Sequence, residues 1–420
     1  MGASTPPGHA ARAGKVTLAV LALTLALAYG IWYAYSVILV ALLDDFGWSR
    51  STVAGAFSLF AVVHGGCNPL VGMLCDRVAP AAVSAVASVV LAGALFACSL
   101  VQAPWQLYLS FGGVTAVAVA ACGWVPAVVQ VQRRFPHRLG FAIGIVSSGV
   151  GVGMFVVVPF CQVLIEAVDW RFAFRVLGAL AFAVILPSSL YLRRSAALTV
   201  PRDDAAPAAG PAMAAPHARS VTLAEAARTA PFWLIVGAFF FGSLCSQTLQ
   251  VHQVAFLVDH GITALAAASV VGVVGLASIF GKTGGGWLSD RVERELVYLG
   301  GIVILVASVF VLFAVGRHTS QLGAYGFAIL LGVGYSATAA LVPAMVSDRF
   351  QGRHFGSILG IGLLGSAAGS ASGPWLAGHL FDVTGSYTLP FGIAAASGVI
   401  AGAAGWSARV LRVRAESRAC

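Results

Sequence analysis

Two seven-residue stretches decide the fold: Gly72-Met73-Leu74-Cys75-Asp76-Arg77-Val78, and its near copy Gly286-Trp287-Leu288-Ser289-Asp290-Arg291-Val292. Their aspartates stand 214 residues apart (290 − 76). A second pair agrees, because Arg134-Phe135 followed by Arg138 returns as Arg349-Phe350 followed by Arg353, an offset of 215 (349 − 134). The two halves of this chain of 420 residues are therefore predicted to repeat one structural unit.

The composition around these stretches is that of a membrane protein. The chain is 59% hydrophobic and 9% charged, whereas a soluble domain carries about a quarter of its residues as charges. A membrane-spanning helix uses about 20 residues, so twelve helices with short connections fill the chain. A water-soluble globule is excluded, and no room is left for a separate catalytic domain.

Apolar runs between polar residues predict an all-α membrane protein with twelve transmembrane helices in two six-helix lobes. The runs are continuously apolar, whereas the strands of a membrane barrel alternate apolar and polar residues. The first run continues for about 28 residues without a small-residue cleavage site, so it is expected to be a helix rather than a signal peptide. The expected helices cover residues 15–43, 51–75, 79–102, 105–132, 139–165, 170–192, 230–258, 262–289, 296–315, 321–346, 355–381 and 388–408.

The basic residues predict the orientation, since cytoplasmic connections of membrane proteins retain Lys and Arg. The odd-numbered connections hold four: Arg50, Arg171, Arg175 and Arg317. The tails and the even-numbered connections hold nineteen: Arg12, Lys15, Arg77, Arg133, Arg134, Arg138, Arg193, Arg194, Arg202, Arg219, Arg228, Arg291, Arg294, Arg349, Arg353, Arg409, Arg412, Arg414 and Arg418. Both termini are therefore expected in the cytoplasm, with the protein in the plasma (inner) membrane.

A polar interval in the middle of the chain, rich in Ala and Pro, is typical of a flexible linker. Two six-helix units repeated in the same orientation are typical of two-lobed transporters. The expected organisation is a cytoplasmic N-tail at 1–14, a first lobe at 15–193, a cytoplasmic linker at 194–229, a second lobe at 230–408 and a cytoplasmic C-tail at 409–420.

Three kinds of ligand are excluded by the residue pattern. The basic residues are scattered between apolar runs rather than gathered in a patch, so no nucleic acid is expected. The seven cysteines show no paired spacing of the disulfide or zinc kind, and neither a metal nor a cofactor is expected. Gly281-Lys282-Thr283 is not a phosphate-binding loop, because that motif requires glycine at position 276, which is leucine.

The two Gly-x-Leu-x-Asp-Arg stretches resemble the signature of the major facilitator superfamily and follow the second and eighth helices, as they do in that family. Narrower features resemble its monocarboxylate transporter branch and the related oxalate/formate antiporter group. These features are Asp45-Phe46-Gly47-Trp48-Ser49-Arg50, Arg138-Leu139-Gly140-Phe141-Ala142-Ile143-Gly144, Asp169-Trp170-Arg171 and Gly373-Pro374-Trp375-Leu376-Ala377-Gly378-His379-Leu380-Phe381-Asp382-Val383-Thr384-Gly385-Ser386-Tyr387.

The resemblance implies a conformational role for Asp76, Arg77, Asp290 and Arg291. In the family the aspartate caps and pairs across the cytoplasmic side of the bundle, and the loop cations hold one conformation closed. Neither copy is complete here, since Ala79 and Glu293 stand where a second glycine is usual. Glycines in the fifth and eleventh helices permit close approach to neighbouring helices: Gly144, Gly149, Gly151, Gly153, Gly360, Gly362, Gly365, Gly369 and Gly373.

Lys282 is the principal candidate for substrate binding, because an ionisable side chain at the centre of a span costs about 2.5 to 3.5 kcal/mol and is usually functional. It lies eight residues, or about 12 Å, from Asp290. Snorkelling of its long side chain to the interface is the alternative. The resemblance implies that Lys282 replaces an arginine that holds the substrate carboxylate. Ser278 stands where proton-coupled relatives often carry aspartate, which leaves proton coupling open.

Aromatic residues and one histidine are further candidates for the substrate site. Tyr335 matches a tyrosine that lines the site in the resembled group, and Tyr33 resembles that group's aromatic pattern. Tyr29 and Trp124 lie deep within their spans, where membrane-interface anchoring does not explain them. Histidine is the side chain whose ordinary pKa lies closest to neutral pH, and His252 is interpreted as a site-lining or outer-gate residue, or else as a structurally satisfied histidine.

These features predict a secondary transporter that moves a small lactate- or pyruvate-like monocarboxylate by alternating access, as a monomer in the lipid bilayer. One buried cation suits one carboxylate. An oxalate/formate-like exchanger and a carrier of another solute on the same fold remain alternatives. An enzyme is not expected because intramembrane acidic clusters are missing, and a non-transporting sensor would normally carry a larger soluble domain.

The predicted topology can be tested with single cysteines at Gly210 and Thr319 in a cysteine-free background. Because the first position lies in the linker and the second in an odd-numbered connection, a membrane-impermeant maleimide should label them from opposite sides. Labelling of both positions from outside intact cells would contradict the orientation.

Overall fold

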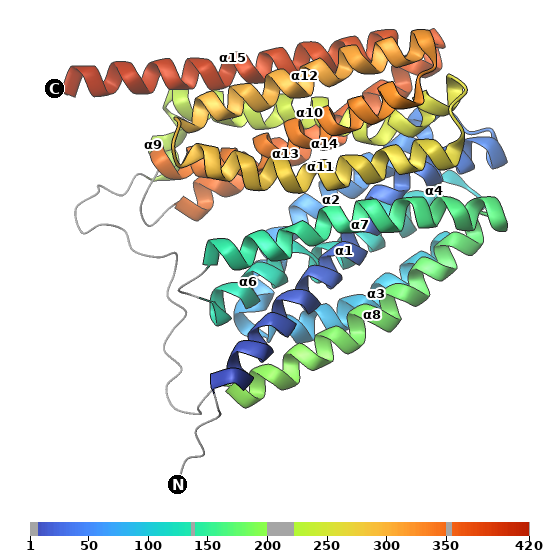
Figure 1. The fold of residues 1–420 in the computed structure, drawn as a ribbon, viewed down its shortest axis with the longest axis horizontal. Helices are drawn as coiled ribbons and strands as arrows, with labels where there is room; N and C mark the ends of the chain where they lie inside the picture. The colour runs from blue at the N-terminus through green and yellow to red at the C-terminus, as the bar shows by residue number, and fades with distance from the viewer. Residues whose placement is uncertain (1–6, 136–138, 200–221, 350–354, 420) are drawn as a thin grey trace.

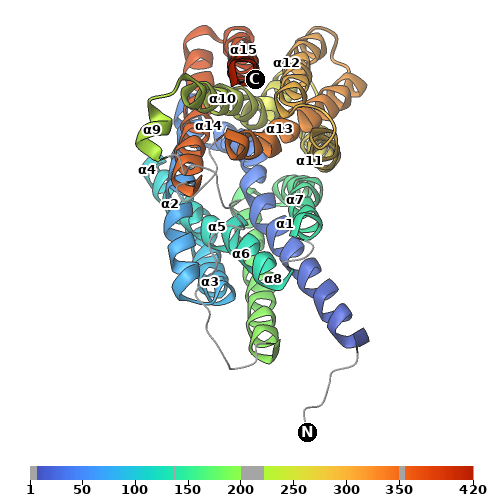
Figure 2. The same ribbon diagram turned by 90° about the vertical axis from the view of Figure 1, so that its left-hand side faces the viewer.

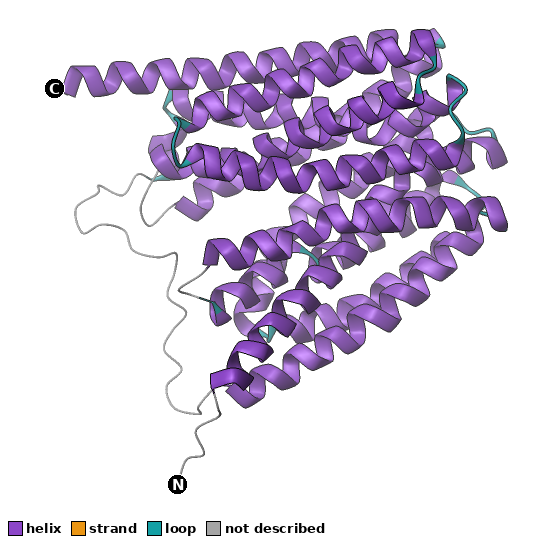
Figure 3. Cartoon of the chain, in the orientation of Figure 1, coloured by secondary structure: helices purple, strands orange, loops and turns teal. Residues whose placement is uncertain are grey.

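The computed structural model describes residues 7–135, 139–199, 222–349 and 355–419, and within them the chain is helical with short connections (Figure 3). The central part of the expected linker, including Gly210, lies outside the described residues, as do Arg138 and Arg353. The elements are α1 (Pro7–Phe46), α2 (Arg50–Arg77), α3 (Pro80–Cys98), α4 (Pro104–Leu107), the π-helix η1 (Tyr108–Thr115), α5 (Ala116–Cys122), α6 (Trp124–Arg134), α7 (Leu139–Ala167), α8 (Trp170–Thr199), α9 (Leu223–Ala227), α10 (Ala230–Asp259), α11 (Ala264–Ser289), α12 (Arg294–His318), α13 (Gln321–Arg349), α14 (Phe355–Thr384) and α15 (Thr388–Ala419).

Ten helical segments of the described chain are long and apolar enough to cross a membrane, with Pro104–Arg134 counted as one, and they match ten of the expected spans. The helices α13 and α14 lie where the tenth and eleventh spans are expected. The expected fourth span is not one helix but the series α4, η1, α5 and α6, with a break at Gly123. The helices α8 and α15 continue beyond their expected ends, to Thr199 and Ala419, and α9 lies within the expected linker.

The helices form two lobes, α1 to α8 and α10 to α15, which the end-on view in Figure 2 separates. In Figure 1 the described ends of the chain lie at the left, on what we call the tail face, which includes Arg77, Arg134, Arg291 and Arg349. The opposite end of the bundle is the distal face, where α1 ends, α2 begins and α14 turns into α15. The lobes lie together toward the distal face and diverge toward the tail face (Figure 1).

The connections at the distal face are set by local sequence. Ser49 caps α2, because its hydroxyl accepts a hydrogen bond of 3.2 Å from the Thr52 amide. Gly47 and Gly261 follow α1 and α10 with φ angles of +63° and +84°, a conformation that favours glycine. These two glycines are also 214 residues apart (261 − 47), so the repeat extends to backbone conformation.

The repeat is also visible in side-chain hydrogen bonds at the tail face. Arg134 donates to the carbonyl of Leu192 near the end of α8, at 2.7 Å. Arg349 donates in the same way to the carbonyl of Ala408 in the second half of α15. Arg134 therefore connects α6 to α8, and Arg349 connects α13 to α15.

Glycines bring helices into backbone contact, as expected from the sequence. A β-carbon added at Gly153 of α7 would collide with the α1 backbone at Ala26, and one added at Gly369 of α14 would collide with the α10 backbone at Phe240. Similar contacts join the lobes along two lines, α7 with α11 and α2 with α14. On the first line a β-carbon at Gly275 would lie 2.5 Å from the Gly151 carbonyl oxygen.

Substitution at this inter-lobe contact should destabilise the protein. Gly275→Ala forces α7 away from α11, and overpacking of this kind typically costs about 1 to 3 kcal/mol. Gly300→Ala is the matched control, since a β-carbon there meets no atom within 4 Å. Thermal unfolding in detergent should show a lower midpoint for Gly275→Ala and an equal or higher one for Gly300→Ala. Equal midpoints for the two variants would show that the contact is not tightly packed.

Candidate functional site

Side chains from both lobes meet at one depth in the middle of the bundle. Tyr33 lies thirteen residues from the distal end of α1, while Ser278 and Tyr335 lie fourteen residues from the distal ends of α11 and α13. At about 1.5 Å per residue, all three are about 20 Å from the distal face. We call Tyr33, Ser278, Tyr335 and the neighbouring Met154 the central layer.

The central layer is held together by polar contacts. The Tyr335 hydroxyl lies 3.9 Å from the Met154 sulfur, and the Tyr335 side chain also interacts with those of Tyr33 and Ser278. Ser278 is fully buried and donates a hydrogen bond of 2.7 Å to the Gly275 carbonyl. Since Tyr33 and Met154 belong to the first lobe and the other two residues to the second, this layer lies at the lobe interface.

Lys282 follows one turn below Ser278 on the tail side of the central layer. It is half-buried and forms no hydrogen bond or ion pair with any residue that the structure describes. Its neighbour Gly281 packs against Ser336 and the Val333 backbone, so α11 and α13 are in close contact at this level. An ammonium group in such a place lacks the counter-charge that a buried cation normally requires.

Tyr29 lies at about the same depth as Lys282 but in the opposite lobe. Seventeen residues separate it from the distal end of α1, and eighteen separate Lys282 from that of α11, so both are about 26 Å deep. The Tyr29 ring stacks on Trp32 with centroids 5.6 Å apart, and its hydroxyl contacts the Trp124 backbone at the α5–α6 break. The Trp124 side chain itself is 38% exposed.

His252 does not belong to this group. It lies seven residues from the distal end of α10, or about 10 Å deep, which is roughly 16 Å nearer the distal face than Lys282. It is fully buried, with Nε2 2.8 Å from the Pro374 carbonyl and Nδ1 3.0 Å from the Tyr387 hydroxyl. Because a carbonyl only accepts, Nε2 carries the proton and Nδ1 accepts from Tyr387. The structure therefore does not bring His252 together with Lys282.

The interactions of His252 belong instead to a network that ties the two lobes together at the distal face. Its centre is Arg50, which donates to both oxygens of Asp259 at 2.9 and 2.8 Å and to the Tyr387 hydroxyl at 2.6 Å. The Asp382 carboxylate accepts from the backbone amides of Arg50 and Ser51, both at 2.8 Å. We call Arg50, Asp259, His252, Asp382 and Tyr387 the distal lock.

The distal lock was not predicted from the sequence, although the sequence contains two signals of it. Arg50 is one of four cations on the side that is poor in cations, and both Arg50 and Asp382 lie in the motifs that carry the resemblance. A second pair of those motifs meets within one lobe, since Asp45 accepts from Arg171 at 2.9 Å and from the Trp170 indole at 3.0 Å. Nothing in the linear pattern distinguishes a pair within a lobe from one between lobes.

The expected gating residues are exposed at the tail face. The side chains of Asp76, Arg77 and Asp290 make no hydrogen bond or ion pair with a described residue, so the implied pairing across the bundle is not seen among the described residues. Arg291 donates to the Trp287 carbonyl at 3.0 Å and lies over the Trp287 ring.

Ion pairs at the tail face lie nearby, within the second lobe. Arg409 and Arg412 both pair with Glu293 at 2.7 Å, and Arg412 also pairs with the buried Glu295 at 3.1 Å. The hydrogen bonds and charge of Arg409, followed by those of Arg412, hold the pKa of the Glu293 carboxyl below its ordinary value. Across the described residues, no group of three or more His, Cys, Asp or Glu side chains has the arrangement of a metal site.

Solved structures share this fold. A bacterial homolog of the human lysosomal transporter Spinster, in an inward-facing and occupied conformation, has a TM-score of 0.72 at 17% identity, covering 97% of this chain and 98% of its own. The same homolog in an inward-facing and unoccupied conformation has a TM-score of 0.70 at 18% identity.

Sequence relatives are transporters by name. Monocarboxylate transporter 12-B of Danio rerio is 27% identical over 77% of this chain and 72% of its own length. Monocarboxylate transporter 13 of Rattus norvegicus is 27% identical over 88% of this chain and 83% of its own length. The uncharacterized MFS-type transporter YcxA of Bacillus subtilis is 22% identical over 85% of this chain and 85% of its own length. The model of the Major Facilitator Superfamily matches residues 21–295 and 251–419. The chain therefore belongs to the Major Facilitator Superfamily.

Proposed function

We propose that the protein is a secondary active transporter that moves a small organic monocarboxylate across the membrane by alternating access. The observation that carries this proposal is Lys282, a half-buried cation without a counter-charge among the described residues. A substrate carboxylate would supply that charge through a charge-assisted hydrogen bond. The names of the relatives support the same class of substrate.

The surroundings of Lys282 suit one carboxylate with a short body. Tyr335 and Tyr33 close the site on the distal side, and Tyr29 lies at the same depth in the other lobe. The single cation neutralises a single carboxylate, and the aromatic rings offer apolar surface to the rest of the molecule. A dicarboxylate would leave its second charge unpaired, which is costly in a poorly hydrated site.

Alternating access is supported by the unequal closure of the two faces. The distal lock and the α2–α14 contact hold the lobes together at one face, whereas the lobes diverge at the other (Figure 1). The distribution of basic residues supports a cytoplasmic position for the diverging tail face. In this conformation a substrate would reach Lys282 from the cytoplasm. Transport then requires the distal lock to open and the tail face to close.

Replacing Lys282 tests the site directly. Lys282→Gln should weaken substrate binding by about tenfold to a hundredfold, because charge-assisted hydrogen bonds contribute about 1.5 to 3 kcal/mol. The protein should still insert, since loss of a buried charge also removes its desolvation cost. Lys282→Arg should retain part of the affinity. Substrate affinity is measured on correctly inserted protein, and a Lys282→Gln value within about twofold of the parent would favour snorkelling instead.

A competition assay tests the substrate class. Lactate or pyruvate should inhibit uptake of a labelled monocarboxylate into proteoliposomes at lower concentrations than oxalate or succinate. This order follows from the one cation of the site. The opposite order would indicate an exchanger of the oxalate type.

The lock can be tested with spin labels at Gln102, in the connection between α3 and α4, and at Gln321, the first residue of α13; both lie at the distal face. Arg50→Gln removes the ion pair between the lobes and should shift the distance distribution toward longer separations. Arg171→Gln is the matched control, because its ion pair with Asp45 lies within the first lobe. If both variants keep the parent distribution, Arg50 does not hold the distal face closed.

A further inference from the structure

A pocket of about 590 Å³ opens beside the distal lock, on the face opposite the tails. Its charged residues are Arg50, Asp259 and Arg317, and its apolar walls include Phe256, Phe313 and Tyr387. Its volume falls within the range of about 300 to 1,000 Å³ that small-molecule sites occupy. We call it the distal pocket.

The charges in the distal pocket are unbalanced. Arg50 is already paired with Asp259, and the Asp382 carboxylate is occupied by two backbone amides of α2. Arg317 makes no hydrogen bond or ion pair with any described residue and is exposed. Its position in the last turn of α12 gains some stabilisation from the helix dipole. That interaction leaves its guanidinium donors free.

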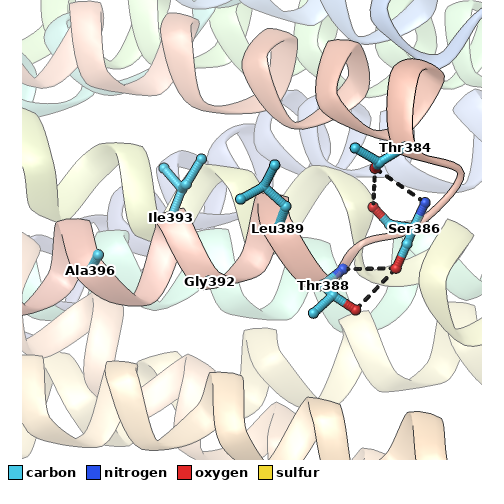
Figure 4. Close-up of a pocket in the computed structure, with 7 residues that line it drawn as sticks. All are labelled: Thr384, Ser386, Thr388, Leu389, Gly392, Ile393 and Ala396. Carbon is cyan, nitrogen blue, oxygen red and sulfur yellow. Dashed lines mark hydrogen bonds between the residues drawn. The ribbon is translucent and has the colours of Figure 1, made fainter.

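A neighbouring pocket of about 440 Å³ provides a contrast (Figure 4). It shares Ser386 and Thr388 with the distal pocket and is otherwise lined largely by aliphatic residues and glycine of α15. As Figure 4 shows, its hydroxyl groups are hydrogen-bonded among Thr384, Ser386 and Thr388. That pocket therefore offers no charged side chain to a ligand, whereas the distal pocket presents two guanidinium groups.

We propose that the distal pocket is a second binding site, for an organic carboxylate, in which the ligand pairs with Arg317 and competes with Asp259 for Arg50. The Arg50–Asp259 pair lines this pocket together with Tyr387, and the two charged side chains are 14% and 34% exposed. The aromatic walls take up the apolar body of the ligand. This inference rests on the alternating access proposed above.

The site has a consequence for gating. A ligand shifts a conformational equilibrium only by its difference in affinity for the two states. Because the carboxylate competes with Asp259, it binds more tightly when Arg50 has left Asp259 than when the lock is closed. Carboxylate on the distal side therefore promotes opening of the distal face before any substrate reaches Lys282.

The test measures the opening of the lock rather than transport. Ser51→Cys places a thiol beside the closed contact, because the backbone of the half-buried Ser51 meets Gly378 of α14. Labelling by a membrane-impermeant maleimide from the distal side is measured in benzoate and in chloride of equal ionic strength. The protein without Ser51→Cys gives the background from the native cysteines. Benzoate should raise the labelling rate about threefold or more.

Two variants assign the effect to a site. Arg317→Gln should abolish the benzoate response, Arg317→Lys should restore part of it, and Lys282→Gln should leave it unchanged. An unresponsive parent, a response that survives Arg317→Gln, or a response lost in Lys282→Gln would each overturn the proposal. Failure of the transport function would appear separately, as absent monocarboxylate uptake in a protein whose distal thiol still responds to benzoate.

Discussion

The structure depends on the requirement that backbone N–H and C=O groups in a bilayer be hydrogen-bonded within their own segment. This requirement makes the described chain helical. Because the helix backbone has no free hydrogen-bonding groups, substrate recognition depends on the few polar and charged side chains within the spans. It also explains why glycine is so frequent, with 49 residues in the chain. Without a hydrophobic driving force between helices, association depends on close packing and on hydrogen bonds between them.

Ion pairs between described residues are concentrated at the two ends of the bundle. At the tail face Arg134 and Arg349 fasten helices within each lobe, and the Glu293 network lies within the second lobe alone. At the distal face Arg50 connects the two lobes. Between the ends, the central layer is polar but uncharged. Lys282, one turn closer to the tail face, is charged. This distribution concentrates the electrostatic cost of separating the lobes at one face.

The two halves repeat in sequence, but equivalent residues in the two halves form ion pairs with different partners. Asp45 and Asp259 are 214 residues apart (259 − 45), and both lie at the distal end of the first helix of their lobe. Asp45 pairs with Arg171 of its own lobe, whereas Asp259 pairs with Arg50 of the other. The position that corresponds to Arg50 in the second half is Ala264, since 50 + 214 = 264. The two lobes therefore repeat the same fold, but the ion pair between them is formed by only one of the two equivalent sets of positions.

The sequence by itself determined the helical class, the repeat, the family and Lys282 as an unusual charge, because hydropathy, spacing and motif are properties of the linear chain. It also indicated the close approach of glycine-rich helices, which Gly153 and Gly369 bear out. Only the tertiary structure decided that Tyr33, Ser278 and Tyr335 share one depth, that His252 lies with Arg50 rather than with Lys282, and that the fourth span breaks at Gly123. The physical reason is that these outcomes depend on which helices face one another across the lobes, and on how far along each helix a residue lies. Neither quantity is encoded in local residue patterns.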